Sequence, residues 1–320
     1  MELKQAKHVF KEMNRMGGDG TPFLFVIDFA KEFGLISALE SLDNQIVYQI
    51  GESLHTDASA INLEKSPIAL SAYKKRFEIV QNAFEKGEVS YLNLTAETPI
   101  QTHTGLQEIY TAAQAPYKLL WKDHFVCFSP EPFVRFKAGE VYSYPMKGTL
   151  LLTESNCVED LLSNPKEQRE HAQAVVLMKA DLEQIAEHVQ VTRYRFIDKI
   201  NTVAGLLAQT SSELKGELPK DYVAHLGDIF NQLLPAASIC GAPKRESFDL
   251  IKSVEPEKRG FYTGVFGVFD GANLESSVLI RFIEQKEKGL VYKSGGGITK
   301  DSDPEKEYDE LLNKIYVPTA

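Results

Sequence analysis

Two acidic segments of the same design lie far apart in this chain. Each begins with a residue suited to cap a helix and then a proline, at Asn164-Pro165 and at Asp303-Pro304. Each then carries a pair of glutamates three residues apart, namely Glu167 with Glu170, and Glu307 with Glu310. Side chains at that spacing share one helical face, where like charges repel. A Mg²⁺ ion between the two helices would relieve the repulsion, because it prefers carboxylate oxygens.

The composition is that of a soluble globular protein and excludes several classes. The 320 residues include 43% apolar and 25% charged side chains, and the net charge of −10 argues against a nucleic-acid partner. The scattered Cys127, Cys157 and Cys240 form no C-x-x-C pair, which indicates a reducing compartment. Charged residues near the start argue against a secretion signal, and the apolar runs are too short to span a membrane. We therefore expect a cytoplasmic protein.

The apolar periodicity predicts an α+β fold with mainly antiparallel sheet. Helices are expected over residues 2–16, 67–86, 105–115, 165–187, 220–234 and 304–316. Strands are expected over residues 23–29, 46–50, 88–95, 125–129, 133–137, 141–146, 261–269, 276–284 and 289–294. The elements come in runs and do not alternate strictly, which disfavours a doubly wound parallel sheet. No linker is evident, so one compact unit is expected.

Lys147 is a candidate nucleophile. It ends a predicted strand and lies between Met146 and Gly148. A lysine in such a position is usually an exposed charge. A desolvated amine beside other cations would instead lose its proton and attack an electrophilic carbon. The residue alone leaves both interpretations open.

Three further motifs could bind an anion. Gly295-Gly296-Gly297 follows a predicted strand and could curl its backbone amides around a carboxylate, although a tight turn is the simpler interpretation. Arg281 is expected in the middle of a strand, where it could point inward to a carboxylate or form an edge charge. Tyr262 could be a core residue or a hydrogen-bond donor to an anion.

Two charged residues also have local explanations. Lys314 lies four residues after Glu310 and could form a simple helical ion pair. Glu167 lies three residues after Asn164 and could close a capping box.

The order of the motifs along the chain is more specific than any one of them. The segments are Pro235–Lys244, Glu255 with Arg259–Gly264, Ile280-Arg281, Gly295–Ile298, Asp301–Asp303 and Glu307–Glu310. In this order they resemble the chorismate-utilising enzymes, which include anthranilate, aminodeoxychorismate, isochorismate and salicylate synthases. The resemblance covers Phe125 to Val317.

The resemblance implies a fold like that of anthranilate synthase component I, in which antiparallel sheets pack as a sandwich with helices around them. Residues 1–320 would form a single chorismate-binding domain. Within it, residues 1–100 would be a shortened amino-terminal subregion, and residues 117–317 would be the best-matched catalytic part.

Lys147 favours one member of this family. Its setting, P-M-K-G-T, resembles the P-I-K-G-T of aminodeoxychorismate synthase component I, whereas anthranilate synthases have alanine in place of the lysine. By resemblance, Lys147 attacks C2 of chorismate, the C4 hydroxyl leaves, ammonia enters at C4, and the lysine is expelled. The product, 4-amino-4-deoxychorismate, leads to 4-aminobenzoate and folate. No cysteine has an amidotransferase setting, so ammonia would be free or come from a separate glutamine amidotransferase subunit.

The same resemblance assigns roles to the other motifs. Glu170 and Glu310 would hold Mg²⁺ directly, with Glu167 and Glu307 acting through water. Gln209 and Lys314 join Lys147 at catalytic positions. The expected substrate-binding residues are Thr149, Ser238, Tyr262, Arg281, Gly295, Gly296 and Gly297.

Four positions depart from the family pattern, and one of them is Tyr144, where the family often has arginine. Val176 and Ala180 replace an aspartate and an asparagine on the first glutamate helix, which puts the support of that helix in question. Gln209 replaces a catalytic histidine, and an amide cannot protonate a leaving hydroxyl. Two alternatives therefore stay open. One is anthranilate synthase component I, which Lys147 disfavours, and the other is a non-catalytic paralogue that binds chorismate or tethers an amidotransferase.

Overall fold

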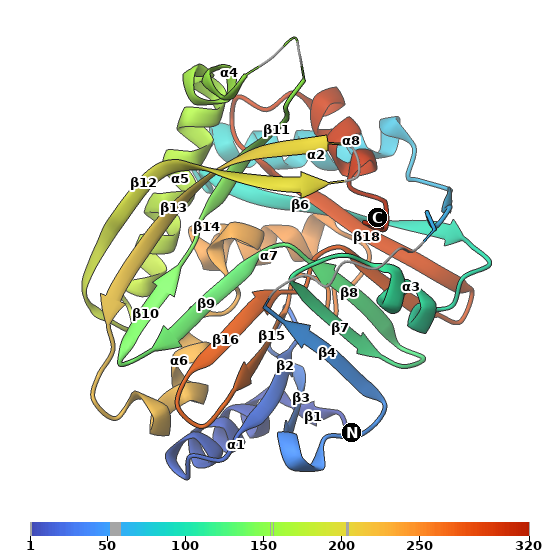
Figure 1. The fold of residues 1–320 in the computed structure, drawn as a ribbon. Coiled ribbons are helices and arrows are strands. Elements are labelled where there is room, and N and C mark those ends of the chain that lie inside the picture. The colour runs from blue at the N-terminus through green and yellow to red at the C-terminus, as the bar shows by residue number, and fades with distance from the viewer. Residues whose placement is uncertain (1, 52–58, 154, 156, 203–204, 320) are drawn as a thin grey trace.

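Two large antiparallel sheets dominate the computed structural model, which describes residues 2–51, 59–153, 155, 157–202 and 205–319 (Figure 1). Within these residues, the first sheet has ten strands in the order β1-β3-β2-β15-β16-β9-β10-β13-β11, with β12 paired to β13. Its strands are β1 (Lys4–Gln5), β2 (Phe23–Ile27), β3 (Phe33–Ala38), β9 (Pro132–Lys137), β10 (Glu140–Ser143), β11 (Met146–Leu151), β12 (Glu187–Thr202), β13 (Gly205–Glu217), β15 (Val265–Phe269) and β16 (Leu274–Val278).

The second sheet has eight strands in the same described part of the chain. Their order is β14-β6-β18-β17-β8-β7-β4, with β5 paired to β6. The strands are β4 (Ile46–Ile50), β5 (Glu64–Lys65), β6 (Tyr91–Gln101), β7 (Tyr117–Trp121), β8 (Phe125–Ser129), β14 (Gly241–Ala242), β17 (Phe282–Lys286) and β18 (Gly289–Ile298). Early and late parts of the chain pair in both sheets, as β2 does with β15 and β6 with β18.

The two sheets pack face to face, and β2 shows why. All five of its residues are buried, and successive side chains point to opposite faces of a strand. Leu24 and Val26 face the second sheet, in a cluster that includes Leu119 and Phe282. Phe25 points the other way, and its ring centroid lies 4.7 Å from that of Phe230 on a covering helix. The continuous apolar run therefore lies in a strand covered on both sides.

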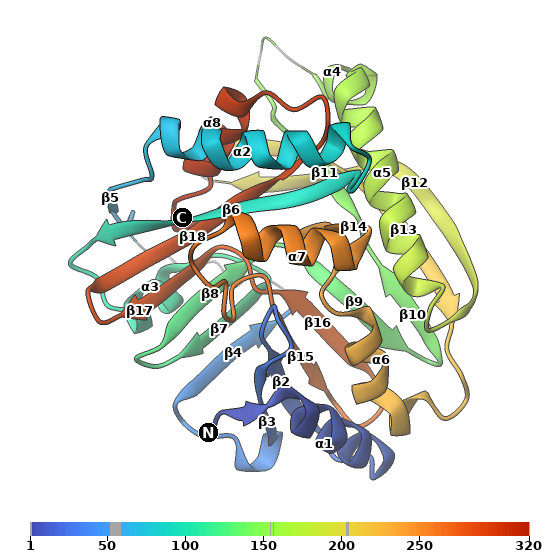
Figure 2. The same cartoon turned by 180° about the vertical axis from the view of Figure 1, so that it is seen from behind.

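Helices cover the outer faces of this sandwich. They are α1 (Ala6–Gly18), α2 (Leu70–Glu85), α3 (Leu106–Ala112), α4 (Val158–Ser163), α5 (Pro165–Leu182), α6 (Leu226–Leu233), α7 (Lys244–Val254) and α8 (Pro304–Asn313). Short 3₁₀ turns are η1 (Leu39–Ser41), η2 (Tyr222–His225) and η3 (Ala237–Ile239). Seen from behind, α2 and α7 lie side by side near β6 (Figure 2). Helix α5 packs on β11 and β13, and α8 packs on β18.

The predicted α+β class with antiparallel sheets and surrounding helices is confirmed. The strands predicted over 46–50 and 125–129 have those bounds. The long hairpin of β12 and β13 was not predicted. The helix expected to reach residue 187 ends at Leu182, and a strand begins at Glu187. Polar and charged side chains occur along the exposed β12, so its sequence lacks the apolar alternation that marks a strand.

The strand predicted over 276–284 is wrong, and so is the mid-strand position of Arg281. Strand β16 ends at Val278 in the first sheet, and β17 begins at Phe282 in the second. Arg281 lies in the crossing between the sheets, with a backbone φ of 53°. The apolar run continues through the crossing because the segment stays buried when it changes sheets.

The described helices include none with an apolar stretch of the length that a bilayer span needs.

The fold contains a buried carboxylate whose protonation should affect stability. Asp28 follows β2, is 6% exposed, and accepts hydrogen bonds from the amides of Glu32 and Phe33 at 2.8 and 2.9 Å. Burial raises the pKa of Asp28 to about 6. The folded state therefore holds this proton more tightly than the unfolded chain, in which the pKa is about 3.9. The stabilisation is complete below pH 4 and is lost as the pH rises through 6.

We expect Asp28→Asn to become progressively more stable than the wild type as the pH rises from 4 to 7. The difference in unfolding free energy should grow by up to about 3 kcal/mol, because the amide cannot ionise. Urea unfolding at each pH measures it. Asp249→Asn, on the exposed face of α7, is the matched control and should show no such trend. A constant difference across this range would contradict the buried ionisation of Asp28.

Candidate active site

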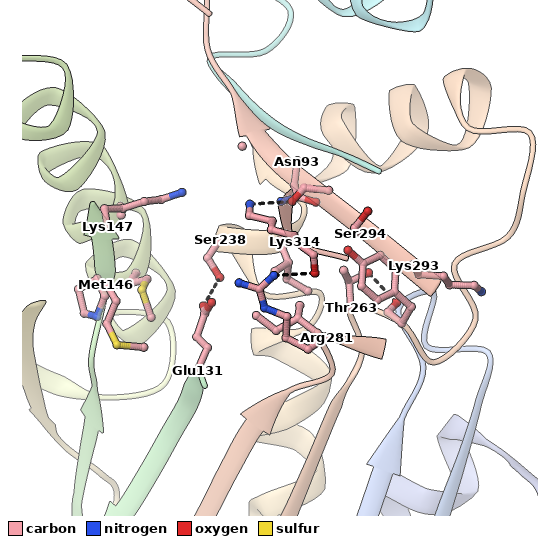
Figure 3. Close-up of a pocket in the computed structure, with 18 residues that line it drawn as sticks. Asn93, Glu131, Met146, Lys147, Ser238, Thr263, Arg281, Lys293, Ser294 and Lys314 are labelled. Carbon is pink, nitrogen blue, oxygen red and sulfur yellow. Dashed lines mark hydrogen bonds between the residues drawn. The ribbon is translucent and has the colours of Figure 1, made fainter. Parts of the chain in front are cut away.

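A cavity of about 120 Å³ lies between β11, α5, β18 and the crossing from β16 to β17 (Figure 3). The charged side chains among its described lining residues are Glu131, Lys147, Arg281, Lys293 and Lys314. Basic groups thus outnumber the acidic one. Lys293 is already paired with Glu97 and Glu284, but the remaining excess of cations still favours a small anionic ligand.

Lys147 reaches this cavity from β11. It pairs with Thr210 of β13, and the next pair is Thr149 with Gln209, so Gly148 is the extra residue of a β-bulge. Gly148 has a φ of 75°, and a Cβ there would lie 2.5 Å from Oε2 of Glu167. Both facts require glycine. The Lys147 side chain points into the cavity (Figure 3), and its Nζ lies 5.6 Å from the centre of the Tyr91 ring.

The surroundings of Lys147 differ from those expected. Neighbouring cations would have lowered the pKa of the amine. Instead, Tyr91, Glu170 and Glu131 together raise the pKa of Lys147 above its ordinary value, against the effect of burial. These neighbours favour the ammonium form of Lys147.

A buried histidine that the sequence did not single out supports this strand. His171, on α5, has no exposed surface, and its Nε2 lies 2.7 Å from Oγ of Ser212. Its Nδ1 lies 3.4 Å from the Thr210 hydroxyl, which also donates to the Lys147 carbonyl. Burial lowers the pKa of His171 to about 4, so the ring is neutral at pH 7. His171 thus joins α5 to the strand pair that carries Lys147.

Glu131 is a further site residue that sequence reasoning missed. It lies between β8 and β9, and its Oε1 accepts a hydrogen bond from Ser238 at 3.4 Å. Burial raises the pKa of Glu131, although Lys147 acts in the opposite direction. The one available signal was an acidic residue held between Pro130 and Pro132 after an apolar strand.

Arg281 and Lys314 form the wall opposite Lys147. Arg281 donates to the Lys314 carbonyl at 2.9 Å, and its guanidinium lies 5.1 Å from the centre of the Tyr316 ring. Lys314 donates to the Gly295 carbonyl at 2.8 Å and to Oε1 of Glu310 at 2.6 Å. Burial lowers the pKa of Lys314, and Glu310 offsets only part of that effect. The predicted ion pair between Lys314 and Glu310 is present. It lies at the cavity and is not a simple surface pair.

The three consecutive glycines have an extended backbone. They form neither the tight turn nor the cradle of amides that the sequence suggested. Gly295, Gly296 and Gly297 lie within β18 and pair with Thr95, Leu94 and Asn93 of β6. Successive amides of a strand point in opposite directions, so they cannot converge on one anion. The glycines provide space instead. A Cβ at Gly297 would lie 2.4 Å from the Tyr91 hydroxyl, and one at Gly296 would lie 3.3 Å from Oε1 of Glu310.

Two other predicted substrate residues line the same cavity. Ser238 lies in η3, and its hydroxyl donates a hydrogen bond to Glu131. Tyr262 is 4% exposed, and burial raises the pKa of Tyr262, so its hydroxyl stays protonated and can donate.

Helices α5 and α8 bring the two glutamate pairs to one end of the cavity. The buried Glu307 of α8 and Glu170 of α5 both lie within 4 Å of the Lys166 ammonium, at 3.9 and 3.4 Å. Burial and neighbouring carboxylates raise the pKa values of Glu167 and Glu307. Burial would also raise the pKa of Glu310, but Lys314 outweighs it and lowers that pKa.

The donor set fits a hard divalent cation. All four side chains offer carboxylate oxygens, and the missing side chains of Gly148 and Gly296 leave room beside them. Among the described residues, however, no three acidic, histidine or cysteine side chains converge closely enough to hold an ion as they stand. Two of these carboxylates form ion pairs with lysine ammonium groups. Lys314 pairs with Glu310, and Lys166 pairs with Glu170.

Other expected site residues are not brought to the cavity. Gln209 is not among its lining residues, and its neighbour Thr210 faces His171, so the glutamine points to the opposite face of the sheet. The Thr149 side chain lies outside the described part of the structure. Val176 is 65% exposed, and Ala180 is also exposed, so both face solvent on the outer side of α5.

A buried ion pair holds two walls of the cavity together. Arg259 donates to both carboxylate oxygens of Glu255, at 2.6 and 2.7 Å, and both side chains are 3% exposed. The same guanidinium donates to the carbonyls of Asn93 in β6 and Ile239 in η3, at 2.6 and 2.8 Å. Glu255 in turn accepts a hydrogen bond from the Thr95 amide at 2.8 Å.

The fold combines a cation-lined cavity between two antiparallel sheets with two glutamate-bearing helices beside it. Residues 29–320 match the family of chorismate binding enzymes, and this chain belongs to that family.

The relatives include synthases of several kinds. A PabA-like protein of Haemophilus influenzae is 44% identical over 323 residues, which cover 99% of this chain and 98% of the relative. Aminodeoxychorismate synthase component 1 of Bacillus subtilis is 28% identical over 266 residues, and the match spans 78% of this chain but 55% of that protein.

Solved structures share the fold. The menaquinone-specific isochorismate synthase of Escherichia coli superposes with a TM-score of 0.70 at 16% identity, covering 98% of this chain and 82% of that one. Anthranilate synthase component I of Streptococcus pneumoniae gives a TM-score of 0.67 at 26% identity, covering 81% and 59%. The predicted anthranilate synthase-like sandwich is therefore confirmed.

We expect Glu255→Leu to destabilise the protein by about 3–5 kcal/mol, because it leaves the buried Arg259 charge without its carboxylate. The double variant Glu255→Leu/Arg259→Met should be less destabilised than Glu255→Leu alone, since no isolated charge remains. Urea unfolding measures both. Arg15→Met, in the exposed pair with Glu12, is the control and should cost less than about 1 kcal/mol. A double variant that is less stable to urea than Glu255→Leu alone would contradict the isolated-charge argument.

Proposed function

We propose that this chain is the component I of an aminodeoxychorismate synthase, which converts chorismate and ammonia to 4-amino-4-deoxychorismate. The observation that carries the proposal is the Lys147 amine, which enters a cation-rich cavity that also contains the buried carboxyl group of Glu131. A lysine nucleophile beside an acid suits displacement of a hydroxyl group. Anthranilate synthase, the alternative, would have no use for an amine at this position.

The proposed substrate is a dianion, which suits the charges of the cavity. Arg281 and the neutral Tyr262 hydroxyl can donate to the enolpyruvyl carboxylate, and Lys314 adds positive charge on the same wall. The ring carboxylate would be directed toward Glu170 and Glu310. A Mg²⁺ ion held there would act as a template and Lewis acid for that carboxylate.

The chemistry requires one proton to move before Lys147 can attack. Neighbouring groups favour the proton on Lys147, while burial raises the pKa of Glu131 and makes it a suitable acceptor. Transfer of that proton to Glu131 yields a free amine and a neutral carboxylic acid. The amine then attacks C2 while Glu131 returns the proton to the departing C4 hydroxyl, which leaves as water.

The second half of the reaction restores the lysine. Ammonia attacks C4 of the adduct, the C2–N bond to Lys147 breaks, and Glu131 accepts the proton that the incoming nitrogen loses. Chorismate and ammonia thus give the amino product and water. We propose that a separate glutamine amidotransferase subunit supplies the ammonia and that the product leads to 4-aminobenzoate and folate.

The first test of the proposed function is turnover of purified protein with chorismate, Mg²⁺ and an ammonium salt. We expect 4-amino-4-deoxychorismate, identified by mass spectrometry, and a loss of more than about a thousandfold in rate for Lys147→Ala. Lys137→Ala, at the hairpin between β9 and β10, is a lysine control away from the cavity and should keep the wild-type rate. Anthranilate or isochorismate as the product would reassign the activity, and full amination by Lys147→Ala would remove the covalent step.

We expect Glu131→Gln to lower the amination rate by roughly 10²–10⁴-fold with little change in KM, because the amide cannot carry the proton. The acid limb of the pH–rate profile should change with it. Ser238→Ala, which removes a hydrogen bond to Glu131 but leaves its carboxyl group in place, should have a smaller effect. Equal effects of the two variants would argue that Glu131 has only a packing role.

A further inference from the structure

Lys166 lies near the amino end of a helix, where a lysine would destabilise an isolated helix. Asn164 caps α5 and Pro165 is its first residue, so Lys166 is the second residue of the helix. The amino end of a helix carries partial positive charge and disfavours a cation. Lys166 also precedes its i,i+4 partner Glu170, and this order is weaker than glutamate before lysine. Local helix stability therefore does not explain this lysine.

The tertiary structure gives Lys166 a second carboxylate. Its Nζ lies 3.4 Å from Oε1 of Glu170 and 3.9 Å from Oε1 of Glu307 on α8. The ammonium group thus bridges the two acidic segments, through Glu170 in the first and Glu307 in the second. Glu307 is 4% exposed, so a counter-ion at this position matters more than at the surface.

Of the two lysines beside these glutamates, Lys166 is held by fewer contacts and can move away more easily. Its side chain is 50% exposed, and the described contacts of its ammonium group are those with the two glutamates. Lys314, the other lysine beside these carboxylates, is held by the Gly295 carbonyl as well as by Glu310. A rotation of the Lys166 side chain into solvent would free oxygens of both helices at once.

We infer that Lys166 is a tethered counter-ion of the glutamate cluster, which neutralises Glu170 and Glu307 until a divalent cation displaces it. The lysine would then hold α5 and α8 together in the cation-free protein and lower the affinity of the cluster for the ion. This inference rests on the magnesium site of the proposed function, but it concerns binding and not turnover.

The test is a Mn²⁺ titration followed by the electron paramagnetic resonance signal of the free ion. We expect Lys166→Gln to lower the Kd roughly five- to tenfold, because one competing positive charge is removed. Lys166→Arg should stay within about threefold of the wild type, since it keeps the charge. Lys179→Gln is the matched control, because Lys179 forms an i,i+4 pair with Glu183 on the same helix, away from the cluster.

Thermal unfolding gives a second readout. Without divalent cations, Lys166→Gln should unfold at a lower temperature than the wild type, because the glutamates lose their counter-ion. Added Mg²⁺ should raise its unfolding temperature more than that of the wild type. Lys179→Gln should show the same Mg²⁺ increment as the wild type.

The outcomes separate this inference from the proposed function. Unchanged or weaker Mn²⁺ binding by Lys166→Gln would overturn the counter-ion role. Absence of Mn²⁺ binding in the wild type and in Lys166→Gln would overturn both the role and the magnesium site. Tighter binding by Lys166→Gln, together with failure of the amination assay, would support the counter-ion and reject the proposed reaction.

Discussion

The cavity depends on the buried pair of Glu255 and Arg259. One guanidinium satisfies the carboxylate and also carbonyls of β6 and η3, so a single side chain sets the distance between two walls. Such a pair is costly to desolvate, and its benefit lies in the number of hydrogen bonds that it satisfies at once. With the walls held in this way, Ser238 and Asn93 line the same space as Lys147, although they come from separate parts of the chain.

Charge balance within that space governs the proposed chemistry. The cavity wall is rich in cations, yet the groups closest in effect to Lys147 are a phenol and carboxylates, which hold its proton in place. Substrate carboxylates would compete for the same cations, and a divalent ion would compete with Lys166 and Lys314 for the glutamates. In the proposed reaction a dianion and a cation would replace these internal ion pairs, so their binding would be linked to the release of the pairs.

Much of the frame was predictable, and the failures have physical causes. Strands such as 46–50 and the glutamate helices were predicted because their apolar periods and caps act locally. Arg281 and the three glycines were misassigned because burial continues across a sheet crossing and because glycine can extend a strand as well as end one. Glu131 and His171 were missed because a single acid in a loop, or one histidine on an apolar helix face, has no sequence pattern that distinguishes it from a core residue.

By itself the sequence determined the class of fold and the two glutamate helices, since hydrophobic period, helix caps and motif order are properties of neighbouring residues. Only the tertiary structure decided which of these groups meet. It brought Lys166 between Glu170 and Glu307, surrounded Lys147 with carboxylates, and turned Gln209 away from the cavity. Side-chain proximity and desolvation depend on strand register and on the crossing between sheets, and these arise from contacts between residues far apart in the chain.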